Sequence, residues 1–396
     1  MDAPTIRVND SALTTSLDHH FMARALQLAQ RGLYSARPNP RVGCVVVNEG
    51  RIVGEGFHAR TGQAHAEINA LQQAGSAAAG ATAYVSMEPC CHHGRTPPCV
   101  QALIDAGIER VVAAMPDPNP CVAGQGLIAL QAAGILTDCG VMASEARRLN
   151  RGFHSRMRRG RPWVRVKSAM SLDGRTAMAS GESRWISGDA ARRDVQYLRA
   201  RSCAILSGGG TLRADNPRLN LRLGTEDFAD DSTGHGCHRD PPPAPPLRVV
   251  LSSNLNIDPQ ARVFTLPGRC LVIGPDATLE IEGKLRAMQR NNVELITVPS
   301  NDNGLDLEAV MRELARREIN EVQVEAGPTL AGALLRGNLV DELIVYMAPM
   351  LMGDAARGLA HLPDIKRMRD RLPLVINDTR IIGDDLRLTL TPAANA

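Results

Sequence analysis

The stretch Met87-Glu-Pro-Cys-Cys-His-His-Gly-Arg-Thr-Pro-Pro-Cys99 holds three of the nine cysteines and two of the ten histidines of the chain within thirteen residues. A second short motif, His65-Ala-Glu67, precedes it. Catalytic zinc takes three nitrogen or sulfur ligands from the protein and leaves its fourth position to water. His65 with two cysteines of the later stretch meets that count, which predicts a zinc site.

The spacing places this site at helix ends. His65 and Glu67 are two residues apart, so they can share a site only near the first turn of a helix. Pro89-Cys90 also suits a helix start, where the helix dipole stabilises a thiolate. We therefore expect two helix N-termini to flank one metal, whose bound water has its pKa lowered to about 7. Glu67, which is not needed as a ligand, is placed to carry protons.

Zinc deaminases of nucleic-acid bases carry H-x-E followed by P-C-x-x-C. The chain has His65-Ala-Glu67 and Pro89-Cys90, but the next cysteine outside the adjacent pair is Cys99, which gives the spacing C-x8-C. The long insert indicates a substrate loop and points away from a plain nucleoside deaminase.

Length, composition and charge limit the number of domains and the kinds of partner. With 396 residues, 44% of them hydrophobic, the chain is expected to form two domains. A net charge of +3 with mixed signs gives no broad basic field, which argues against nucleic acid as a partner. The sequence has no signal-peptide pattern and no apolar run of about eighteen residues. Together with cysteines that lack disulfide spacing, this predicts a cytoplasmic protein without a membrane partner.

Short apolar runs alternate with helical patterns along the first 160 residues, which is typical of a layered α/β domain. We expect strands at 42–47, 51–57, 83–87 and 110–115, helices at 19–32, 65–74 and 98–106, and a further helix and strand to about Val141. A basic segment, 156–162, ends in Gly160-Arg-Pro162 and marks the predicted boundary between domains 1–160 and 161–396.

The alternation restarts after this boundary, which predicts a second α/β domain. The expected strands are 163–169, 204–207, 247–251, 293–298, 321–325, 342–349 and 386–390, and the expected helices are 189–200, 306–317 and 329–336. The polar, proline-rich segment 224–246 is interpreted as an exposed loop inside this domain.

Several motifs of the first domain resemble the deaminase domain of the bifunctional riboflavin-biosynthesis deaminase/reductase family. They are His65-Ala-Glu67, Glu88-Pro-Cys90, Pro97-Pro-Cys99, Pro38-Asn-Pro-Arg-Val-Gly43 and Gly54-Glu-Gly-Phe-His58. The resemblance covers nearly the whole chain. It implies a three-layer fold like that of cytidine deaminase and a substrate, 2,5-diamino-6-(5-phosphoribosylamino)pyrimidin-4-one, that loses its 2-amino group as ammonia.

The same resemblance implies roles for single residues. His65, Cys90 and Cys99 become the zinc ligands and Glu67 the proton shuttle. Asn39 would contact the ring or ribose of the substrate, and Arg95 with His58 could meet its phosphate. Cys91, where the family usually has serine, is not among the implied ligands, and His92 and His93 more often orient neighbours than bind anything.

Motifs of the second half resemble the reductase domain of this family, which has a fold like dihydrofolate reductase and uses NADPH. They are Ser168-Ala-Met-Ser-Leu-Asp-Gly-Arg175, Gly181-Glu-Ser-Arg-Trp-Ile186, Gly208-Gly-Gly-Thr211, Ala214-Asp-Asn-Pro217 and Glu325-Ala-Gly-Pro-Thr-Leu-Ala-Gly332. The resemblance implies a nucleotide site formed by Ala169, Trp185, Thr211, Asp215, Ser253, Gly327, Pro328, Thr329, Leu330, Ala331, Gly332 and Ala333. It implies substrate contacts from Ser183, Arg199, Leu219, Arg222 and Glu325, with the two arginines suited to a phosphate.

The implied second reaction is hydride transfer from NADPH to the ribosyl C1' of 5-amino-6-(5-phosphoribosylamino)uracil, which opens the sugar to a ribityl chain. Lys167 and Asp215 are both candidates for the acid of this step. Ser252 stands where the family often has Asp and brings a neutral hydroxyl to that position, while Ser253 keeps its expected hydroxyl.

Two other hypotheses remain open at this stage. The first is a deaminase of nucleosides or nucleic-acid bases joined to an unrelated domain, and the missing basic groove and the long insert argue against it. The second is a structural zinc in a binding module, but such zinc is normally closed by four protein ligands and gives no reason for Glu67. The sequence leaves the oligomeric state open, a homo-oligomer included.

Overall fold

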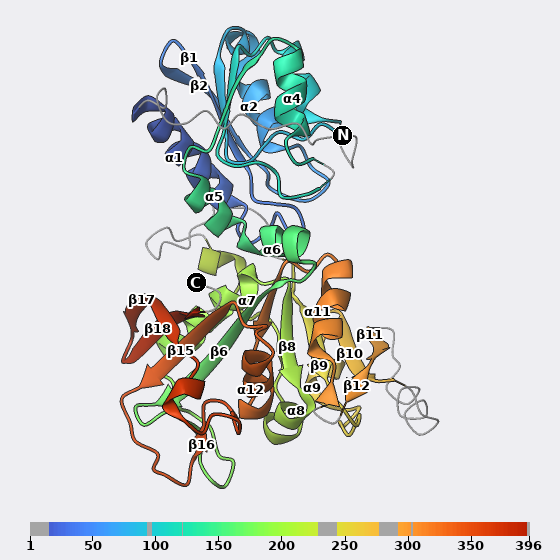
Figure 1. The fold of residues 1–396 in the computed structure, drawn as a ribbon, viewed down its shortest axis with the longest axis vertical. Helices are drawn as coiled ribbons and strands as arrows, with labels where there is room; N and C mark the ends of the chain where they lie inside the picture. Colours follow the sequence, from blue (N-terminus) through green and yellow to red (C-terminus); the bar gives the residue numbers. More distant parts are fainter. Residues whose placement is uncertain are drawn as a thin grey trace. The chain divides into compact units, whose positions relative to one another are not determined.

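The computed structural model describes residues 16–92, 97–120, 122–228, 244–276, 292–301 and 304–393. Within these ranges the chain divides into two compact units (Figure 1). The first unit runs to Gly160 and also takes in residues 224–228, and the second comprises the other described residues from Arg161 onward. Each unit has its own β-sheet, and no helix of the described residues is long and apolar enough to cross a membrane.

The first unit is built on a five-stranded sheet of order β2-β1-β3-β4-β5. Strand β1 pairs antiparallel with β2 and β3, whereas β3, β4 and β5 are parallel. The strands are β1 (Gly43–Asn48), β2 (Arg51–Phe57), β3 (Thr82–Val85), β4 (Arg110–Ala113) and β5 (Leu136–Cys139). The helices are α1 (Ser16–Arg31), α2 (Ala66–Ala74), α3 (Cys99–Asp105), α4 (Gln125–Ala132), α5 (Ala143–Leu149) and α6 (Arg151–Arg159).

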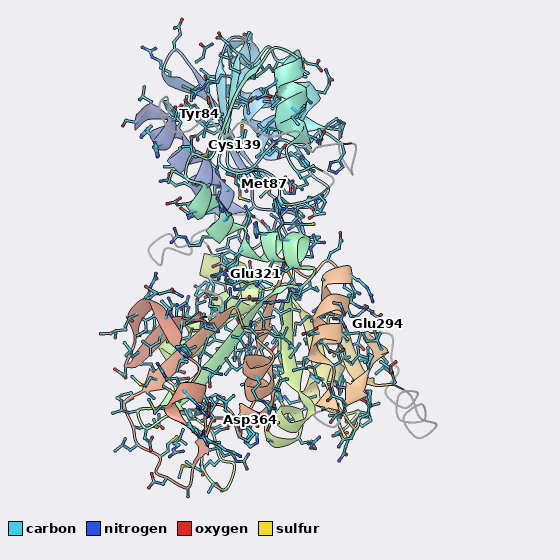
Figure 2. All side chains as sticks on the ribbon, viewed as in Figure 1. Tyr84, Met87, Cys139, Glu294, Glu321 and Asp364 are labelled. Atoms are coloured by element: carbon cyan, nitrogen blue, oxygen red, sulfur yellow. The ribbon has the colours of Figure 1, made fainter. Side chains whose placement is uncertain are left out.

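Helices cover both faces of this sheet because successive strand residues face opposite sides. Val45 of β1 packs in one apolar cluster with residues of α1, α5 and α6. Its neighbour Val46 packs in the other cluster, with alanines of α2 and Leu103 of α3. Figure 2 shows Tyr84 and Met87 of the first cluster among the side chains of this unit. The unit therefore has the three layers predicted for it.

The second unit contains a nine-stranded sheet of order β11-β10-β9-β8-β14-β6-β15-β18-β17. Strands β11 to β15 in this order are parallel, and β18 and β17 add two antiparallel strands at one edge. The strands are β6 (Trp163–Ser171), β8 (Ala204–Gly208), β9 (Leu247–Leu251), β10 (Cys270–Pro275), β11 (Val293–Val298), β14 (Glu321–Val324), β15 (Glu342–Ala348), β17 (Leu374–Ile382) and β18 (Asp385–Pro392). Two short ladders pair β7 (Arg175–Ala177) with β16 (Arg357–Gly358) and β12 (Ser300–Asn301) with β13 (Gly304–Leu305).

Helices again flank both faces of the sheet. Leu343 of β15 packs in the same cluster as buried residues of α11 (Leu307–Arg316) and α12 (Pro328–Arg336). The adjacent Ile344 packs instead with α7 (Asp189–Arg201), and α8 (Gly209–Asp215) and α9 (Arg262–Thr265) complete a further cluster around β9 and β10. Because parallel strands end at a common edge, loops from many segments meet there and can form a site.

Most elements lie within a few residues of their predicted bounds, and the exceptions are instructive. The basic segment around Arg156, interpreted as linker, belongs to helix α6, which packs Phe153 into the first core. Strands β10 and β17 were not predicted. Segment 224–246 was expected as an exposed loop of the second domain, but Phe228 is buried in the first unit with its ring 5.0 Å from that of Tyr34. Residues 229–243 of that segment lie outside the described residues.

Candidate active sites

Three side chains converge at one end of the first sheet. His65 is the N-cap residue of α2, and Cys99 is the first residue of α3, preceded by Pro98. Cys90 lies in the irregular segment after β3. His65 Nδ1 lies 3.1 Å from Cys99 Sγ and 3.6 Å from Cys90 Sγ, and the three ligand atoms are all within 4.8 Å of one another.

The geometry corrects one detail of the prediction. Two helix N-termini do lie at the cluster, but the second is that of α3 at Cys99, and Cys90 does not begin a helix. Cys90 is instead held by α3, because the backbone N–H of Cys99 donates to Cys90 Sγ at 3.3 Å and that of Val100 donates to Cys90 O at 3.2 Å. Proline therefore precedes the helix start at Pro98, not at Pro89.

The donor set fits zinc. Two thiols and one imidazole are ligands that zinc prefers, and around a tetrahedral ion the ligand atoms lie about 3.5 to 3.8 Å apart. The separation of 3.6 Å between His65 and Cys90 falls in this range, and that of 3.1 Å to Cys99 is slightly shorter. Within the described residues this is the one group of metal-binding character, and it offers three ligands, as a catalytic site requires.

The electrostatics of the cluster favour a thiolate and a proton carrier. Hydrogen bonding from Cys99, aided by His65, lowers the pKa of Cys90 to about 4. Glu67 in the first turn of α2 is 3% exposed, and burial, followed by the charge of Cys90, raises its pKa to about 7. A carboxyl group in this range exchanges protons readily near neutral pH.

Two further candidate residues of the opening stretch, Cys91 and His92, are described by the structure and are not part of the ligand cluster. Cys91 packs against the apolar cluster that contains Val46 and Leu103, and burial raises the pKa of its thiol. His92 is exposed. His93 and Arg95 lie outside the described residues, so the suggested phosphate contact of Arg95 is not described by the structure.

His58 does not have the free ring that a phosphate ligand needs. It is 3% exposed, and its Nδ1 lies 3.2 Å from the carbonyl oxygen of Ala64. A carbonyl can only accept, so Nδ1 carries the proton and Nε2 accepts from Asn39 Nδ2 at 3.1 Å. Burial lowers the pKa of His58. The imidazole is therefore a neutral support for Asn39 and packs edge-on against His65, with the ring centroids 5.2 Å apart.

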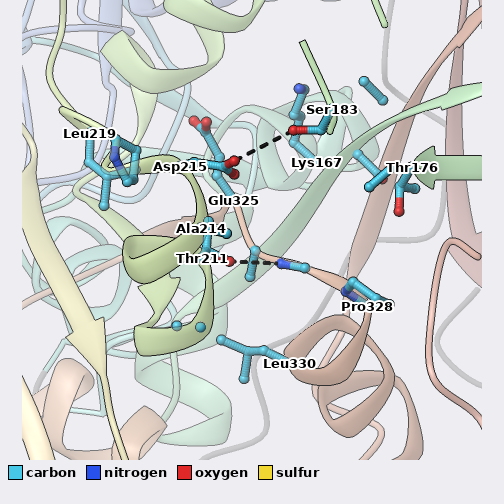
Figure 3. Close-up of a pocket in the computed structure, with 18 of the residues that line it drawn as sticks. Lys167, Thr176, Ser183, Thr211, Ala214, Asp215, Leu219, Glu325, Pro328 and Leu330 are labelled. Carbon is cyan, nitrogen blue, oxygen red and sulfur yellow. Dashed lines mark hydrogen bonds between the residues drawn. The ribbon is translucent and has the colours of Figure 1, made fainter. Parts of the chain in front are cut away.

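The second unit contains a large cavity of about 1150 Å³ at the carboxyl ends of its parallel strands (Figure 3). It is lined by Lys167 and by most of the residues implied for the nucleotide and the substrate. These are Ala169, Ser183, Trp185, Arg199, Thr211, Asp215, Leu219, Arg222, Ser253, Glu325, Gly327, Pro328, Thr329, Leu330 and Ala333. Ala331 and Gly332 do not line it, and a side chain at Gly332 would come within 2.1 Å of His361 O.

Glu325, the residue that follows β14, is the charged centre of this cavity. Its carboxylate accepts from Arg199 Nε and from an Arg199 terminal nitrogen, both at 2.7 Å, and from Gln323 Nε2 at 2.9 Å. Burial alone would raise the pKa of Glu325, but Arg199 and then Lys167 lower it to about 2. Burial lowers the pKa of Lys167. The cavity thus holds an ionised carboxylate close to a desolvated amine.

Two contacts join the loops around the cavity. Gly327, the N-cap residue of α12, donates its backbone N–H to Thr211 Oγ1 at 3.1 Å, and Ser183 Oγ lies 3.5 Å from Asp215 Oδ1 (Figure 3). A Cβ atom at Gly327 would meet Thr211 Oγ1 only at 3.8 Å, so the open space there is available to a ligand. Ser252 is 4% exposed and faces the protein, whereas Ser253 lines the cavity.

The cavity is more basic than the sequence indicated. Among the described residues, eight arginines line it against two carboxylates. Only Arg199 and Arg222 were predicted; the others are Arg184, Arg192, Arg213, Arg218, Arg262 and Arg357. Arg184 lies in the motif 181–186. The three arginines between residues 213 and 222 could have indicated from the sequence that this cavity is basic. Arg192 stacks its guanidinium 4.4 Å from the ring centroid of Trp185, which is 67% exposed.

Family models match both units. The model of the cytidine and deoxycytidylate deaminase zinc-binding region matches residues 15–115, and that of the RibD C-terminal domain matches residues 162–386. Among curated relatives, the riboflavin biosynthesis protein RibD of Escherichia coli K12 is 49% identical over 95% of this chain and 100% of its own length. The protein of the same name from Haemophilus influenzae is 48% identical over 96% of this chain and 98% of its own.

Solved structures agree over the same length. RibD of Acinetobacter baumannii matches with a TM-score of 0.84 at 42% identity, covering 95% of this chain and 99% of its own. The diaminohydroxyphosphoribosylaminopyrimidine deaminase/5-amino-6-(5-phosphoribosylamino)uracil reductase of Thermotoga maritima matches with a TM-score of 0.80 at 30% identity, with the same coverage. The predicted α/β fold of both parts, the zinc-binding deaminase type and the NADPH-using reductase type are thereby confirmed. The chain belongs to the RibD family, the bifunctional deaminase/reductases of riboflavin biosynthesis.

Proposed function

We propose that residues 1–160 deaminate 2,5-diamino-6-(5-phosphoribosylamino)pyrimidin-4-one and that residues 161–396 reduce the product, 5-amino-6-(5-phosphoribosylamino)uracil. The observation that carries the proposal is the convergence of His65, Cys90 and Cys99 near a buried, unligated Glu67. A structural zinc site would need a fourth ligand and would have no use for Glu67.

In the deaminase site, His65, Cys90 and Cys99 would hold the zinc ion. When bound, zinc supplies a water molecule whose pKa is lowered to about 7. Glu67 accepts a proton from the attacking water and returns it to the leaving 2-amino group, so that the C–N bond breaks and ammonia departs. Asn39, which is hydrogen-bonded to His58, would contact the ring or ribose of the substrate.

In the reductase site, the first turn of α12 would hold the phosphates of NADPH, since the backbone N–H groups that directly follow Pro328 have no partner within the helix and favour anions. The N–H of Gly327 is bonded to Thr211 Oγ1, which fixes the loop at Thr211 beside this turn. NADPH supplies a hydride to C1' of the ribosyl group. As that carbon is reduced, its bond to the ring oxygen breaks and the oxygen needs a proton. We assign this donation to Lys167, because its half-buried amine lies close enough to Glu325 to lower the pKa of that carboxyl group. The carboxylate of Asp215 lies 3.5 Å from Ser183 Oγ, and Arg184 bonds only the backbone carbonyl of Asp215.

The phosphate of the substrate would be held by Arg222 together with Arg199. Arg222 lines the cavity and is exposed, and within the described part of the chain its guanidinium donates no hydrogen bond. The guanidinium of Arg199 already donates to the Glu325 carboxylate and to Asn220 O at 2.7 Å, so Arg199 also positions that carboxylate.

We also propose that the chain works as a homo-oligomer in the cytoplasm. Four apolar side chains of the edge strand β17 are exposed, Leu374, Val375, Ile376 and Ile381. An uncovered apolar edge strand favours pairing with another chain. The cysteines within the described residues are free thiols, which a reducing compartment preserves. Neither nucleic acid nor membrane is a proposed partner.

The experiment is an assay of the purified, zinc-loaded chain with the pyrimidinone phosphate and with cytidine, followed by NADPH oxidation. We expect ammonia from the first substrate only, then oxidation of NADPH by the deaminated product. Glu67→Gln should stay folded and zinc-loaded, keep the reductase activity and lose the deaminase activity. Ammonia from cytidine alone would contradict the proposal, and so would zinc-loaded protein that turns over neither substrate.

A further inference from the structure

Glu88 is a motif residue to which the reactions above assign no task. It stands two residues before Cys90, is 4% exposed, and its carboxylate accepts four backbone hydrogen bonds. Oε2 accepts from the N–H of Asp117 at 3.0 Å and of Gly124 at 2.8 Å. Oε1 accepts from the N–H of Gly126 at 2.9 Å and of Leu127 at 3.3 Å. A buried carboxylate is costly unless it is satisfied in this way.

These bonds join three separate segments of the first unit. Glu88 follows β3, Asp117 follows the parallel neighbour β4, and Gly124 to Leu127 form the start of α4. Helix α4 has Gly124 as its N-cap residue, with φ of 90° and no side chain to cap the first N–H groups. Glu88 therefore supplies from outside the helix the acceptor that the local sequence lacks.

The packing ties this junction to the metal ligand. A Cβ atom at Gly126 would lie 2.1 Å from Pro89 O, so the start of α4 rests directly on the peptide between Glu88 and Cys90. On its other side, Cys90 is bonded to the first turn of α3 through Cys99 and Val100. Cys90 thus sits between two helix starts, one of which depends on Glu88.

We propose that Glu88 is a positioning residue of the deaminase site, which holds Cys90 and the turn at Asp117 to Asn119 in a fixed relation. Asn119 donates its N–H to Asp117 Oδ1 at 2.8 Å, so a bond within the turn adjoins the bond between Asp117 and Glu88. The proposal rests on the deaminase function of this unit, and extends it to a residue that touches neither metal nor substrate.

Glu88→Gln tests the role of the carboxylate with little change of shape. Glutamine has one oxygen acceptor, and its amide nitrogen would face N–H donors, so two of the four bonds are lost. Glu55→Gln is the matched control: Glu55 lies in the same unit, and its charge pairs with Arg24 Nε at 2.6 Å. The reductase activity of the same polypeptide reports whether the chain has folded.

Three readouts are measured on zinc-loaded protein. In Glu88→Gln we expect the amides of Asp117, Gly124, Gly126 and Leu127 to exchange hydrogen about tenfold faster or more. We expect zinc release to a chelator to be accelerated by a similar factor, as for other residues that orient metal ligands, of about 10- to 100-fold. The deaminase KM should rise by about tenfold per zinc-loaded site, because the segment that carries Cys90 shifts and a small misplacement near the reacting atoms weakens substrate positioning. Glu55→Gln should match the wild type in all three.

A purely structural role gives a different pattern. If Glu88→Gln lowers only the melting temperature, while amide exchange, zinc release and KM of the folded fraction stay at wild-type values, the proposal is wrong. If Glu88→Gln cannot be recovered as folded protein, Glu88→Asp replaces it, because aspartate keeps the charge but is one methylene shorter. The proposal then requires that Glu88→Asp releases zinc faster than the wild type. Wild-type protein without deaminase activity would contradict the proposed function, while amide exchange and zinc release would still decide the role of Glu88.

Discussion

Arg199 and Glu325 form a bidentate ion pair inside the cavity of the second unit, with both N to O distances at 2.7 Å. The two side chains come from α7 and from the segment after β14, more than a hundred residues apart in the chain. Both are largely buried, at 10% and 15% side-chain exposure. Such a pair stabilises the fold only while the carboxyl group is ionised.

The first prediction concerns acid stability. Glu325 has a pKa of about 2 in the folded protein against an ordinary value of 4.5. Its contribution is present above the unfolded value and is lost as the pH falls from about 4.5 toward 2, by about 3 kcal/mol in total. Urea unfolding of the second unit between pH 6 and pH 3 should show this slope. Glu325→Gln should flatten it, and an unchanged slope would contradict the assignment.

The second prediction concerns Gln323. Its Nε2 donates to Glu325, while its buried Oε1 has no hydrogen-bond partner. Gln323→Met keeps the volume and removes the unsatisfied oxygen, so stability should change by less than about 1.5 kcal/mol. The reductase kcat should nevertheless fall several-fold, because Glu325 loses a positioning donor. Steady-state NADPH oxidation checks this, with the deaminase activity as the internal control. A stable variant with full reductase activity would show that Gln323 has no such role.

The third prediction concerns Gly327 at the start of α12. A methyl group there meets Thr211 Oγ1 at 3.8 Å, which is ordinary contact, so Gly327→Ala should fold normally. A phosphate seated on the helix start would be displaced by it, because glycine allows the closest approach to the backbone. We expect KM for NADPH to rise about tenfold or more with the melting temperature unchanged. An unaltered KM would place the phosphates elsewhere in the cavity.

The fourth prediction concerns the two adjacent cysteines. Cys91 packs against apolar side chains and lies outside the ligand cluster. Cys91→Ser should therefore keep stoichiometric zinc and a deaminase kcat within about twofold of the wild type, as small changes away from a site usually do. Cys90→Ser and Cys99→Ser should lose both zinc and deaminase activity. Metal analysis of the three variants decides, and loss of zinc from Cys91→Ser would overturn the ligand assignment.

Much of the deaminase site follows from the sequence because its chemistry is concentrated in short motifs. The pattern of His65, Glu67, Cys90 and Cys99 restricts the metal and the reaction, and the structure brings the three proposed ligands together. The placement of Cys90 at a helix start was wrong, since that interpretation used only the preceding proline. The helix begins at Cys99, where the chain leaves the insert after Pro97 and Pro98.

The support of the site could not be derived in this way. The four bonds to Glu88 come from residues about 30 to 40 positions away, and no periodicity reports such a contact. The same holds for the ion pair of Arg199 with Glu325 and for the burial of His58, whose side chain looked like a phosphate ligand. Helix α6 was not predicted, because most of its residues are charged and Phe153 alone gives little apolar pattern. Strand β17 was not predicted, because its exposed apolar side chains do not alternate with polar ones.

We propose above all that a zinc site with Glu67 as proton carrier deaminates the phosphorylated pyrimidinone. The most direct measurement is ammonia release from that substrate by zinc-loaded wild type and by zinc-loaded Glu67→Gln. We expect turnover by the wild type and none by the variant, with equal zinc content and equal NADPH oxidation when the deaminated product is supplied. Equal ammonia release by the two proteins would contradict it.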